Sequence, residues 1–199
     1  MLNKTDLAAP LGVSVPTITQ WLSVLETTAQ ILIVPPFFEN FGKRLIKSPK
    51  IYIADSGLAC HLLGIDSVAE LEKSPFHGAL FEGFIAAEIV KAQTNTGRRR
   101  EIYYFRDEQG LEVDFLVPGK SGAVALIECK TSRTVSPAMA LSMQRLAEAV
   151  KKKRLKGTAV DMFLVHQQPR TKSPTQAVAP GVRALAWQDF LEEFQPSKG

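Results

Sequence analysis

Several features that would assign a function directly are absent from this sequence of 199 residues. It contains only two cysteines, Cys60 and Cys129, and neither belongs to a Cys-x-x-Cys pair, so zinc-finger and dithiol redox classes receive little support. No apolar run reaches the roughly 18 residues that a membrane span requires. The N-terminus shows no basic stretch followed by a long apolar one, as a signal peptide would. A cytoplasmic protein that makes no membrane contact is therefore expected.

No Gly-x-x-x-x-Gly-Lys-Ser/Thr phosphate loop occurs either, so this chain alone is not expected to hydrolyse ATP by that route. The excess of positive charge is small: 24 Lys and Arg residues face 20 Asp and Glu residues, for a net charge of +4. This bias permits a nucleic-acid partner without requiring one. With 45% hydrophobic and 22% charged residues, the composition is that of a folded protein, and the length allows one large domain or two small ones.

Residues 1–65 predict a small helix-turn-helix domain of the winged-helix type. Ser14 is a good N-cap for the second helix, and Pro16 falls in its first turn, where a missing N–H costs nothing. The apolar positions that follow at helical spacing predict one buried face: Ile18, Trp21, Leu22 and Leu25. Short strands over 31–34 and 50–53 then supply the wing.

Polar and basic side chains of this first domain suit a DNA surface. Thr17 and Gln20 lie on the helix expected to enter a groove. The basic residues of the wing would meet phosphates: Lys43, Arg44, Lys47 and Lys50. Winged-helix units also serve as protein-contact modules, so the sequence leaves both uses open.

Residues 66–199 alternate between helical and strand patterns and predict a second, larger domain of the α/β class. Helices are expected over 76–94, 137–153 and 187–194, and strands over 101–106, 112–117, 123–129, 161–166 and 182–185. The polar stretch 167–180, rich in Pro, Thr and Ser, is expected to be a loop. A hairpin followed by a crossover helix to a further strand gives a mixed sheet with helices on both faces.

Three charged residues stand out because they lie on apolar strands. Asp114 sits among large apolar residues, and Glu128 and Lys130 close the next strand on a shared face, since side chains alternate along a strand. If the two strands are neighbours, their carboxylates repel each other, and Mg²⁺ or Mn²⁺ would resolve the repulsion. Such a cation polarises a phosphoryl oxygen and activates water. Lys130 would position that water, and the carbonyl of Cys129 is a further candidate ligand.

This pattern resembles the PD-(D/E)xK nuclease superfamily, in which an Asp precedes a strand that carries Glu-x-Lys. Here Asp114 is followed fourteen positions later by Glu128-Cys129-Lys130. The strings over 78–85, 103–107, 110–115 and 127–130 more closely resemble the DUF4143 domain, which typically follows an AAA+ ATPase module in prokaryotic proteins. The N-terminal part resembles the winged-helix region that lies between those two modules, and the comparison implies that residues 1–65 lack the first helix of that region.

The resemblance implies a restriction-endonuclease-like fold. It also implies that Glu82, on the first helix of that fold, supports the metal, and that Gln144, on a later helix, meets nucleic acid. An AAA+ ATPase module or a partner subunit is the implied protein partner. Because no ATPase module is present in this chain, the chain looks like a C-terminal fragment of such a protein or a truncated relative of it.

The expected function is thus a nucleic-acid-interacting module with a Mg²⁺-dependent phosphodiesterase site at Glu82, Asp114, Glu128 and Lys130. One alternative is a non-catalytic module that docks onto an ATPase domain or another subunit. A third is a DNA-binding regulator with an inactive core, and homo-oligomers are left open. An open acidic pocket would favour catalysis, whereas a pocket filled by a side chain would favour the non-catalytic module. Glu112 is either a ligand in place of Glu82 or a solvated residue at a strand start.

Overall fold

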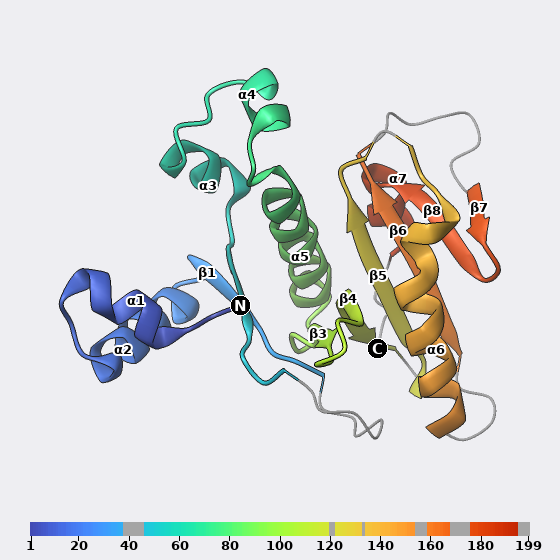
Figure 1. Cartoon of the computed structure of the whole chain (residues 1–199), viewed down its shortest axis with the longest axis horizontal. Helices are drawn as coiled ribbons and strands as arrows, with labels where there is room; N and C mark the ends of the chain where they lie inside the picture. The colour runs from blue at the N-terminus through green and yellow to red at the C-terminus, as the bar shows by residue number, and fades with distance from the viewer. Residues whose placement is uncertain (38–45, 120–121, 133, 154–158, 168–175, 195–199) are drawn as a thin grey trace.

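The computed structural model describes residues 1–37, 46–119, 122–132, 134–153, 159–167 and 176–194 (Figure 1). Its N-terminal part is a helix-turn-helix followed by an antiparallel hairpin. The elements are helices α1 (Lys4–Leu11) and α2 (Val15–Thr27) and strands β1 (Ile31–Val34) and β2 (Lys50–Ile53). Two short helices, α3 (Ser56–Leu62) and α4 (Val68–Lys73), lead to the second part.

The second part is built on a six-stranded mixed sheet with the order β3-β4-β5-β6-β8-β7. Its strands are β3 (Tyr103–Arg106), β4 (Glu112–Pro118), β5 (Val124–Lys130), β6 (Val160–His166), β7 (Gln176–Ala179) and β8 (Val182–Ala186). Its helices are α5 (His77–Asn95), α6 (Leu141–Lys153) and α7 (Trp187–Glu193). Strands β3 to β5 are antiparallel, whereas β5, β6 and β8 are parallel. The predicted α/β class, a mixed sheet flanked by helices, is confirmed.

Short-range signals in the sequence set several element boundaries. The side chain of Ser14 accepts the Thr17 N–H and begins α2, as predicted. Gly12 ends α1 with a φ of 64°, a left-handed conformation that glycine adopts without steric cost. Asp55 begins α3 by accepting the Leu58 N–H at 2.8 Å. Each cap satisfies a backbone group that the helix itself leaves unpaired.

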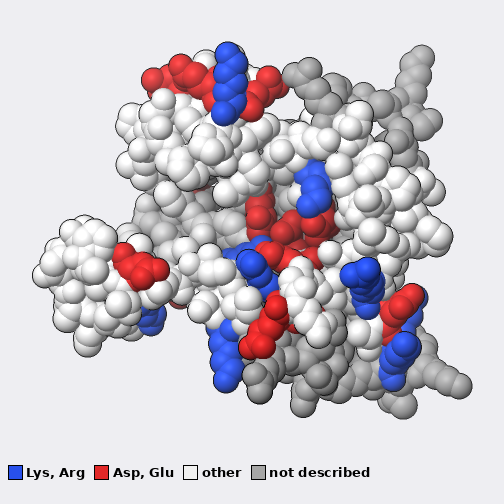
Figure 2. Space-filling model, in the orientation of Figure 1, with Lys and Arg blue, Asp and Glu red and all other residues white. Residues whose placement is uncertain are grey.

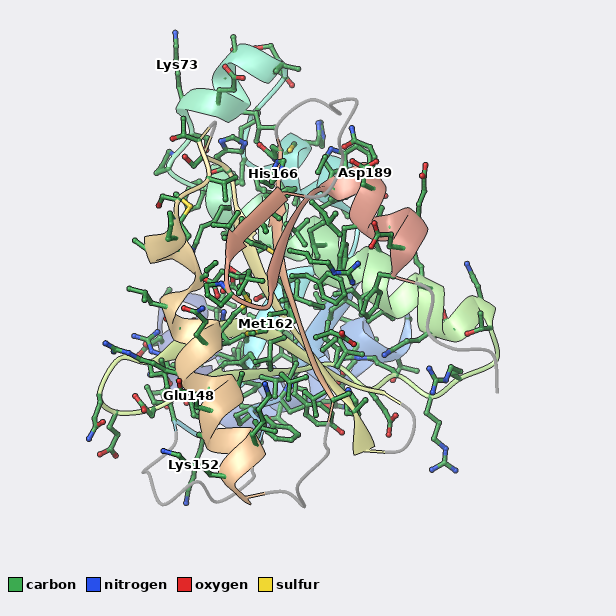
Figure 3. All side chains as sticks on the ribbon, turned by 90° about the vertical axis from the view of Figure 1, so that its right-hand side faces the viewer. Lys73, Glu148, Lys152, Met162, His166 and Asp189 are labelled. Carbon is green, nitrogen blue, oxygen red and sulfur yellow. The ribbon has the colours of Figure 1, made fainter. Side chains whose placement is uncertain are left out.

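Helices cover both faces of the main sheet. On one face, α5 and α7 pack on the strands through a core that includes Ile85 and Phe115, both fully buried. On the other face α6 packs through residues such as Leu146. Figure 3 shows α6 running along this face, with the exposed residues Glu148 and Lys152 marked on it. Within the described ranges, none of the helices combines the length and apolar character needed to cross a membrane.

The β1–β2 hairpin joins the two parts of the molecule, because its residues pack into two different cores. Leu32 and Val34 are buried together with Phe81 of α5 in the core under the main sheet. Ile31 is instead buried against Ile18 of α2 in a small N-terminal core. In Figure 1 the hairpin accordingly lies between α2 and α5. A domain boundary near residue 65 remains a prediction, since the hairpin contributes to both cores.

The buried face of α2 is narrower than the sequence predicted. Ile18 and Leu22 are buried, as expected, but Trp21 is 48% exposed and Leu25 is 40% exposed. Only α1 and β1 make extensive contacts with α2 among the described elements. A helix that touches its neighbours along one side can bury a stripe of limited width, so the outer part of the apolar face stays in solvent.

A strand also occurs within the segment that was expected to be a loop. Residues Gln176–Ala179 form β7, an edge strand that pairs antiparallel with β8. The hairpin turn between them contains Gly181, which has a φ of 74°. Two of the four residues of β7 are alanines, which are depleted in strands, so the pairing with β8 supports this strand as well as the β propensity of Val178.

The shared core gives the first prediction. Substituting Leu32→Ala should lower the free energy of unfolding of the whole chain by about 2–5 kcal/mol, because the cavity lies in the core beneath α5. The exposed residue Leu62 provides a matched control, and Leu62→Ala should change that free energy by less than about 0.5 kcal/mol. Urea denaturation followed by circular dichroism measures both. An early, separate transition in Leu32→Ala, with the main transition unmoved, would contradict the shared core.

Candidate active site between helix α5 and strands β4 and β5

Strands β4 and β5 bring the two central acids together. Phe115 pairs with Ile127 at the last step of their ladder. Continuing that antiparallel register by one residue sets Asp114 opposite Glu128. The ladder stops there, and the Cys129 N–H donates instead to Oδ2 of Asp114 at 2.9 Å. The carboxylates that the sequence predicted to meet therefore lie at the same end of two neighbouring strands.

A β-bulge in β4 helps to aim Asp114. Tyr103 of β3 pairs with Leu116 of β4, and Phe105 pairs with Val113. Two residue steps along β3 thus correspond to three along β4, so β4 has one extra residue, at Asp114 or Phe115. A bulge interrupts the strict alternation of side chains and re-aims one of them. Phe115 packs in the core under α5. On that same side of the sheet, Oδ1 of Asp114 lies 3.4 Å from Nζ of Lys50.

Glu128 is buried, with 8% of the residue exposed. Its Oε1 accepts a hydrogen bond from Lys130 Nζ at 2.7 Å, so the two residues that share a strand face also form an ion pair. Its Oε2 is buried and has no hydrogen-bond partner among the residues that the structure describes. A buried carboxylate oxygen without a partner is unfavourable, and a proton or a cation at this atom would relieve the cost.

A lysine from the N-terminal hairpin fills the other side of the acidic site. Lys50 Nζ lies 2.7 Å from Oε1 of Glu82, 2.9 Å from Oε1 of Glu112 and 3.4 Å from Oδ1 of Asp114. It also lies 5.5 Å from the centroid of the Tyr104 ring, within the range of a cation–π contact. Only 9% of Lys50 is exposed. One ammonium thus holds three carboxylates from α5 and β4.

Tyr52, two residues further along β2, contacts the same acid. Its hydroxyl donates a hydrogen bond to Oε1 of Glu82, the atom that Lys50 also contacts. The Tyr52 ring packs at 6.0 Å, centroid to centroid, from the ring of Phe115. Gly83 allows this approach, because a Cβ at residue 83 would lie 3.2 Å from Cδ1 of Tyr52. Strand β2 therefore presents one polar face to the acids and is held against α5.

Burial and mutual repulsion shift the proton affinities of these groups. Burial, and to a smaller extent the negative charge of Asp114, raise the pKa of Glu128 to about 7, although the positive charge of Lys130 opposes the shift. The same two causes raise the pKa of Glu82, against the effect of Lys50. Burial alone would lower the pKa of Lys50, but Asp114 and Glu82 outweigh it and hold the pKa above its usual value. The lysine is thus charged, and Glu128 is poised to take up a proton near neutral pH.

The site is visible from outside. Figure 2 shows acidic side chains at the bottom of a hollow near the centre of this face, between α5 and β5, with basic side chains at its rim. Glu112 is the most exposed of the four acids, with 33% of its side chain in solvent, and it also pairs with Arg106 at 3.4 Å. Solvent can therefore reach the cluster from the side of Glu112.

The residues predicted to contact nucleic acid lie elsewhere. Gln20 and Lys47 are exposed, whereas the Thr17 hydroxyl lies 2.9 Å from that of Ser14 at the start of α2. The side-chain amide of Gln144 donates to the carbonyl of Pro180, in the β7–β8 turn, at 3.2 Å. Lys43 and Arg44 lie outside the described residues. A nucleic-acid role for all of these residues remains a prediction.

The sequence interpretation missed the contribution of the hairpin to the site. Lys50 was expected on a wing facing phosphate, but it is buried among the acids. Glu112 was left as a ligand or a solvated residue, and the structure pairs it with Lys50. A signal was present: Lys50 and Tyr52 share one face of a short strand whose other face carries Ile51 and Ile53. A lysine on such a strand needs a buried counter-charge, which the acids of the second part provide.

The fold and the site together define a mixed α/β domain with an acid–lysine cluster, to which helix α5, strands β4 and β5 and the β1–β2 hairpin contribute. The chain belongs to the family described as a domain of unknown function, DUF4143, whose model matches residues 77–178. A second family model, also described as a domain of unknown function (DUF8612), matches residues 1–69.

Two curated relatives are uncharacterized proteins from Mycobacterium bovis and Mycobacterium tuberculosis. Each is 35% identical over 144 residues, which is 72% of this chain and 31% of the relative. The match therefore spans about a third of the length of these relatives. A crystal structure of a repair endonuclease from Pyrococcus abyssi covers 54% of this chain and 41% of its own, with 17% identity and a TM-score of 0.28. That likeness is too low to support a conclusion.

The raised pKa of Glu128 predicts a pH-dependent stability. Its folded pKa of about 7 exceeds the value near 4.5 of a free carboxyl, so the folded state binds the proton more tightly. The contribution of Glu128 to stability is therefore lost as the pH rises through that window. Between about pH 5 and pH 8, the free energy of unfolding should fall by about 1–3 kcal/mol more in the wild type than in Glu128→Gln.

Urea denaturation at both pH values measures this difference. Glu88→Gln is the control, because Glu88 forms an ion pair with the exposed Lys91 and should leave the pH dependence of the wild type intact. An identical pH dependence in the wild type and in Glu128→Gln would show that the folded pKa of Glu128 is not raised.

Proposed function

We propose that this chain processes nucleic acid and that its acid–lysine site hydrolyses phosphodiester bonds with a divalent cation, Mg²⁺ or Mn²⁺. The observation that carries the proposal is the convergence of Asp114, Glu128 and Lys130 at the end of the β4–β5 ladder. There Oε2 of Glu128 is buried and has no hydrogen-bond partner within the described part of the chain. Membership of the DUF4143 family is compatible with a nuclease-like module but assigns no reaction by itself.

The donor set fits a cation that keeps much of its water. No three His, Cys, Asp or Glu side chains are arranged to hold a metal among the residues that the structure describes. Two carboxylates, Asp114 and Glu128, and the nearby carbonyl of Cys129 remain as candidate ligands. Mg²⁺ usually binds proteins through one or two carboxylates and retains several waters, so this set is sufficient. Glu82 would support it, once the contacts that Glu82 and Asp114 make with Lys50 are released.

When bound, the cation would supply a Lewis acid for a phosphoryl oxygen and a water of lowered pKa. Asp114 and Glu128 would hold the cation, and the Cys129 N–H would keep Asp114 oriented through its contact with Oδ2. Lys130 is 34% exposed and carries a positive charge held by Glu128. It would position the attacking water and stabilise the negative charge that develops on the phosphate.

The N-terminal part would bring this site to its substrate. Gln20 and Lys47 are exposed and have side chains suited to DNA or phosphate contact. The remaining two thirds of the relatives' length leaves room for further modules, and an AAA+ ATPase module is the partner that the family resemblance suggests. DNA binding and an ATPase partner are both part of this proposal.

A second candidate function is a non-catalytic interaction module that docks onto an ATPase domain or a partner subunit. The observation that favours it is the position of Lys50, which fills the acidic site from within the same chain. A site whose charges are satisfied internally can act as a structural joint between the two parts of the molecule. The exposed apolar residues Trp21 and Leu25 would then be candidates for the docking surface.

Cleavage assays separate these candidates. The 199-residue chain should cleave single-stranded or duplex DNA, or RNA, in the presence of Mg²⁺ or Mn²⁺ and not in the presence of EDTA. Asp114→Asn, Glu128→Gln and Lys130→Met should each reduce the rate about 100-fold or more, since each removes a charge needed in the transition state. Fragments resolved by gel electrophoresis provide the measurement.

Lys91→Met is the matched control for the lysine substitution, because Lys91 is a largely exposed lysine in an ion pair with Glu88, outside the site. It should cleave at the rate of the wild type. Cleavage that persists in Asp114→Asn and Glu128→Gln would point to a contaminating nuclease. No cleavage of any substrate at saturating Mn²⁺, by either the wild type or Lys50→Met, would favour the interaction module.

A further inference from the structure

The position of Lys50 has a consequence for how the acidic site takes up a cation. Lys50 comes from the N-terminal hairpin, whereas its three partners Glu82, Glu112 and Asp114 come from α5 and β4. An ammonium has three N–H donors, and the three carboxylates lie within 2.7 to 3.4 Å of this one. The carboxylates thus surround a positive charge that belongs to the protein itself.

The hairpin is anchored so that Lys50 is held in place. Tyr52 donates a hydrogen bond to Glu82 from the same strand face, and Leu32 and Val34 bury the hairpin against α5. The Lys50 stem is buried, and its ammonium contacts the ring of Tyr104. Moving Lys50 out of the site therefore requires a change of its side-chain rotamer or a shift of strand β2 as a unit.

The site nevertheless keeps unused capacity for positive charge. Four carboxylates face three basic side chains: Lys50 contacts three of the acids, Arg106 also pairs with Glu112, and Lys130 pairs with Glu128. Oε2 of Glu128 is buried, and none of the described residues forms a hydrogen bond with it. Asp114 interacts with both Lys50 and Glu128: its Oδ1 contacts the Lys50 ammonium, and its negative charge raises the pKa of Glu128. A divalent cation drawn to Asp114 and Glu128 would meet the ammonium of Lys50 at close range.

We propose that Lys50 is a tethered counter-ion that competes with divalent cations for the acidic site, so that the position of the β1–β2 hairpin sets the cation affinity. In the conformation seen here, Lys50 neutralises Asp114 and Glu82 and holds the site in a cation-poor state. Withdrawal of Lys50 exposes both carboxylates and raises the affinity. The inference rests on the proposed cation site but does not depend on whether that site cleaves nucleic acid.

Mn²⁺ binding to the full chain tests this directly, by calorimetry and by the electron paramagnetic resonance signal of free Mn²⁺. Lys50→Met removes the ammonium but keeps the length of the side chain, and it should bind Mn²⁺ about tenfold more tightly than the wild type or more. The matched control Lys91→Met, which removes an exposed lysine outside the cluster, should bind as the wild type does. Unchanged or weaker binding in Lys50→Met would overturn the proposal.

A measurement on the wild type keeps the test decisive if Lys50→Met does not fold. The side-chain ammonium groups of ¹⁵N-labelled lysines can be followed by NMR, and the buried ammonium of Lys50 should give a resonance protected from exchange with water. Saturating Mg²⁺ should move that resonance and remove its protection. A Lys50 resonance that stays protected at saturating Mg²⁺ would show that the ammonium and the cation do not compete.

Cleavage by the same variants separates this inference from the proposed function. Tighter Mn²⁺ binding in Lys50→Met without cleavage of any nucleic acid would support the counter-ion role and contradict phosphodiester hydrolysis. Cleavage by the wild type with equal Mn²⁺ affinity in both proteins would support hydrolysis and overturn the role of Lys50.

Discussion

The contact of one lysine ammonium with three carboxylates links most features of this molecule. Lys50, Glu82, Glu112 and Asp114 come from three different elements, and each would be costly to bury alone. Together they satisfy one another, provided that β2, α5 and β4 keep their positions. The β-bulge that aims Asp114 and the glycine on α5 that admits Tyr52 both serve this arrangement. The hairpin is therefore part of the wall of the acidic site as well as part of the N-terminal unit.

This arrangement connects the two parts of the chain through charge as well as through apolar packing. Apolar contacts of Leu32 and Val34 fix the hairpin on α5, while Lys50 and Tyr52 carry its polar face to the acids. The exposed N-terminal helices and the acidic site are thus connected through a single short strand. Buried ion pairs are weak sources of stability but are sensitive to the loss of one partner, which suits a contact that is made and released.

Much of the fold and part of the site follow from the sequence. The apolar residues around Asp114 and Glu128 predicted two strands that each carry an acid. In the structure, the antiparallel register of β4 and β5 brings those two acids together. Lys50 could not be placed in the same way, because its partners lie from 32 to 64 residues further along the chain. Only tertiary packing decides which side of the hairpin faces α5. Similarly, Trp21 follows the helical period of a buried face, yet the neighbours of α2 are too few to cover it.

The most direct measurement of the central contact is a double-mutant cycle on the free energy of unfolding, with Lys50→Met, Glu82→Gln and the double substitution, in EDTA. If the ammonium compensates the carboxylate, Glu82→Gln should destabilise the wild type but be neutral or stabilising once Lys50 is absent, because it then relieves repulsion among the acids. The expected coupling free energy between Lys50 and Glu82 is about 1–3 kcal/mol. Additive effects of the two substitutions, within about 0.5 kcal/mol, would contradict it, because they would show that Lys50 does not hold the acidic site together.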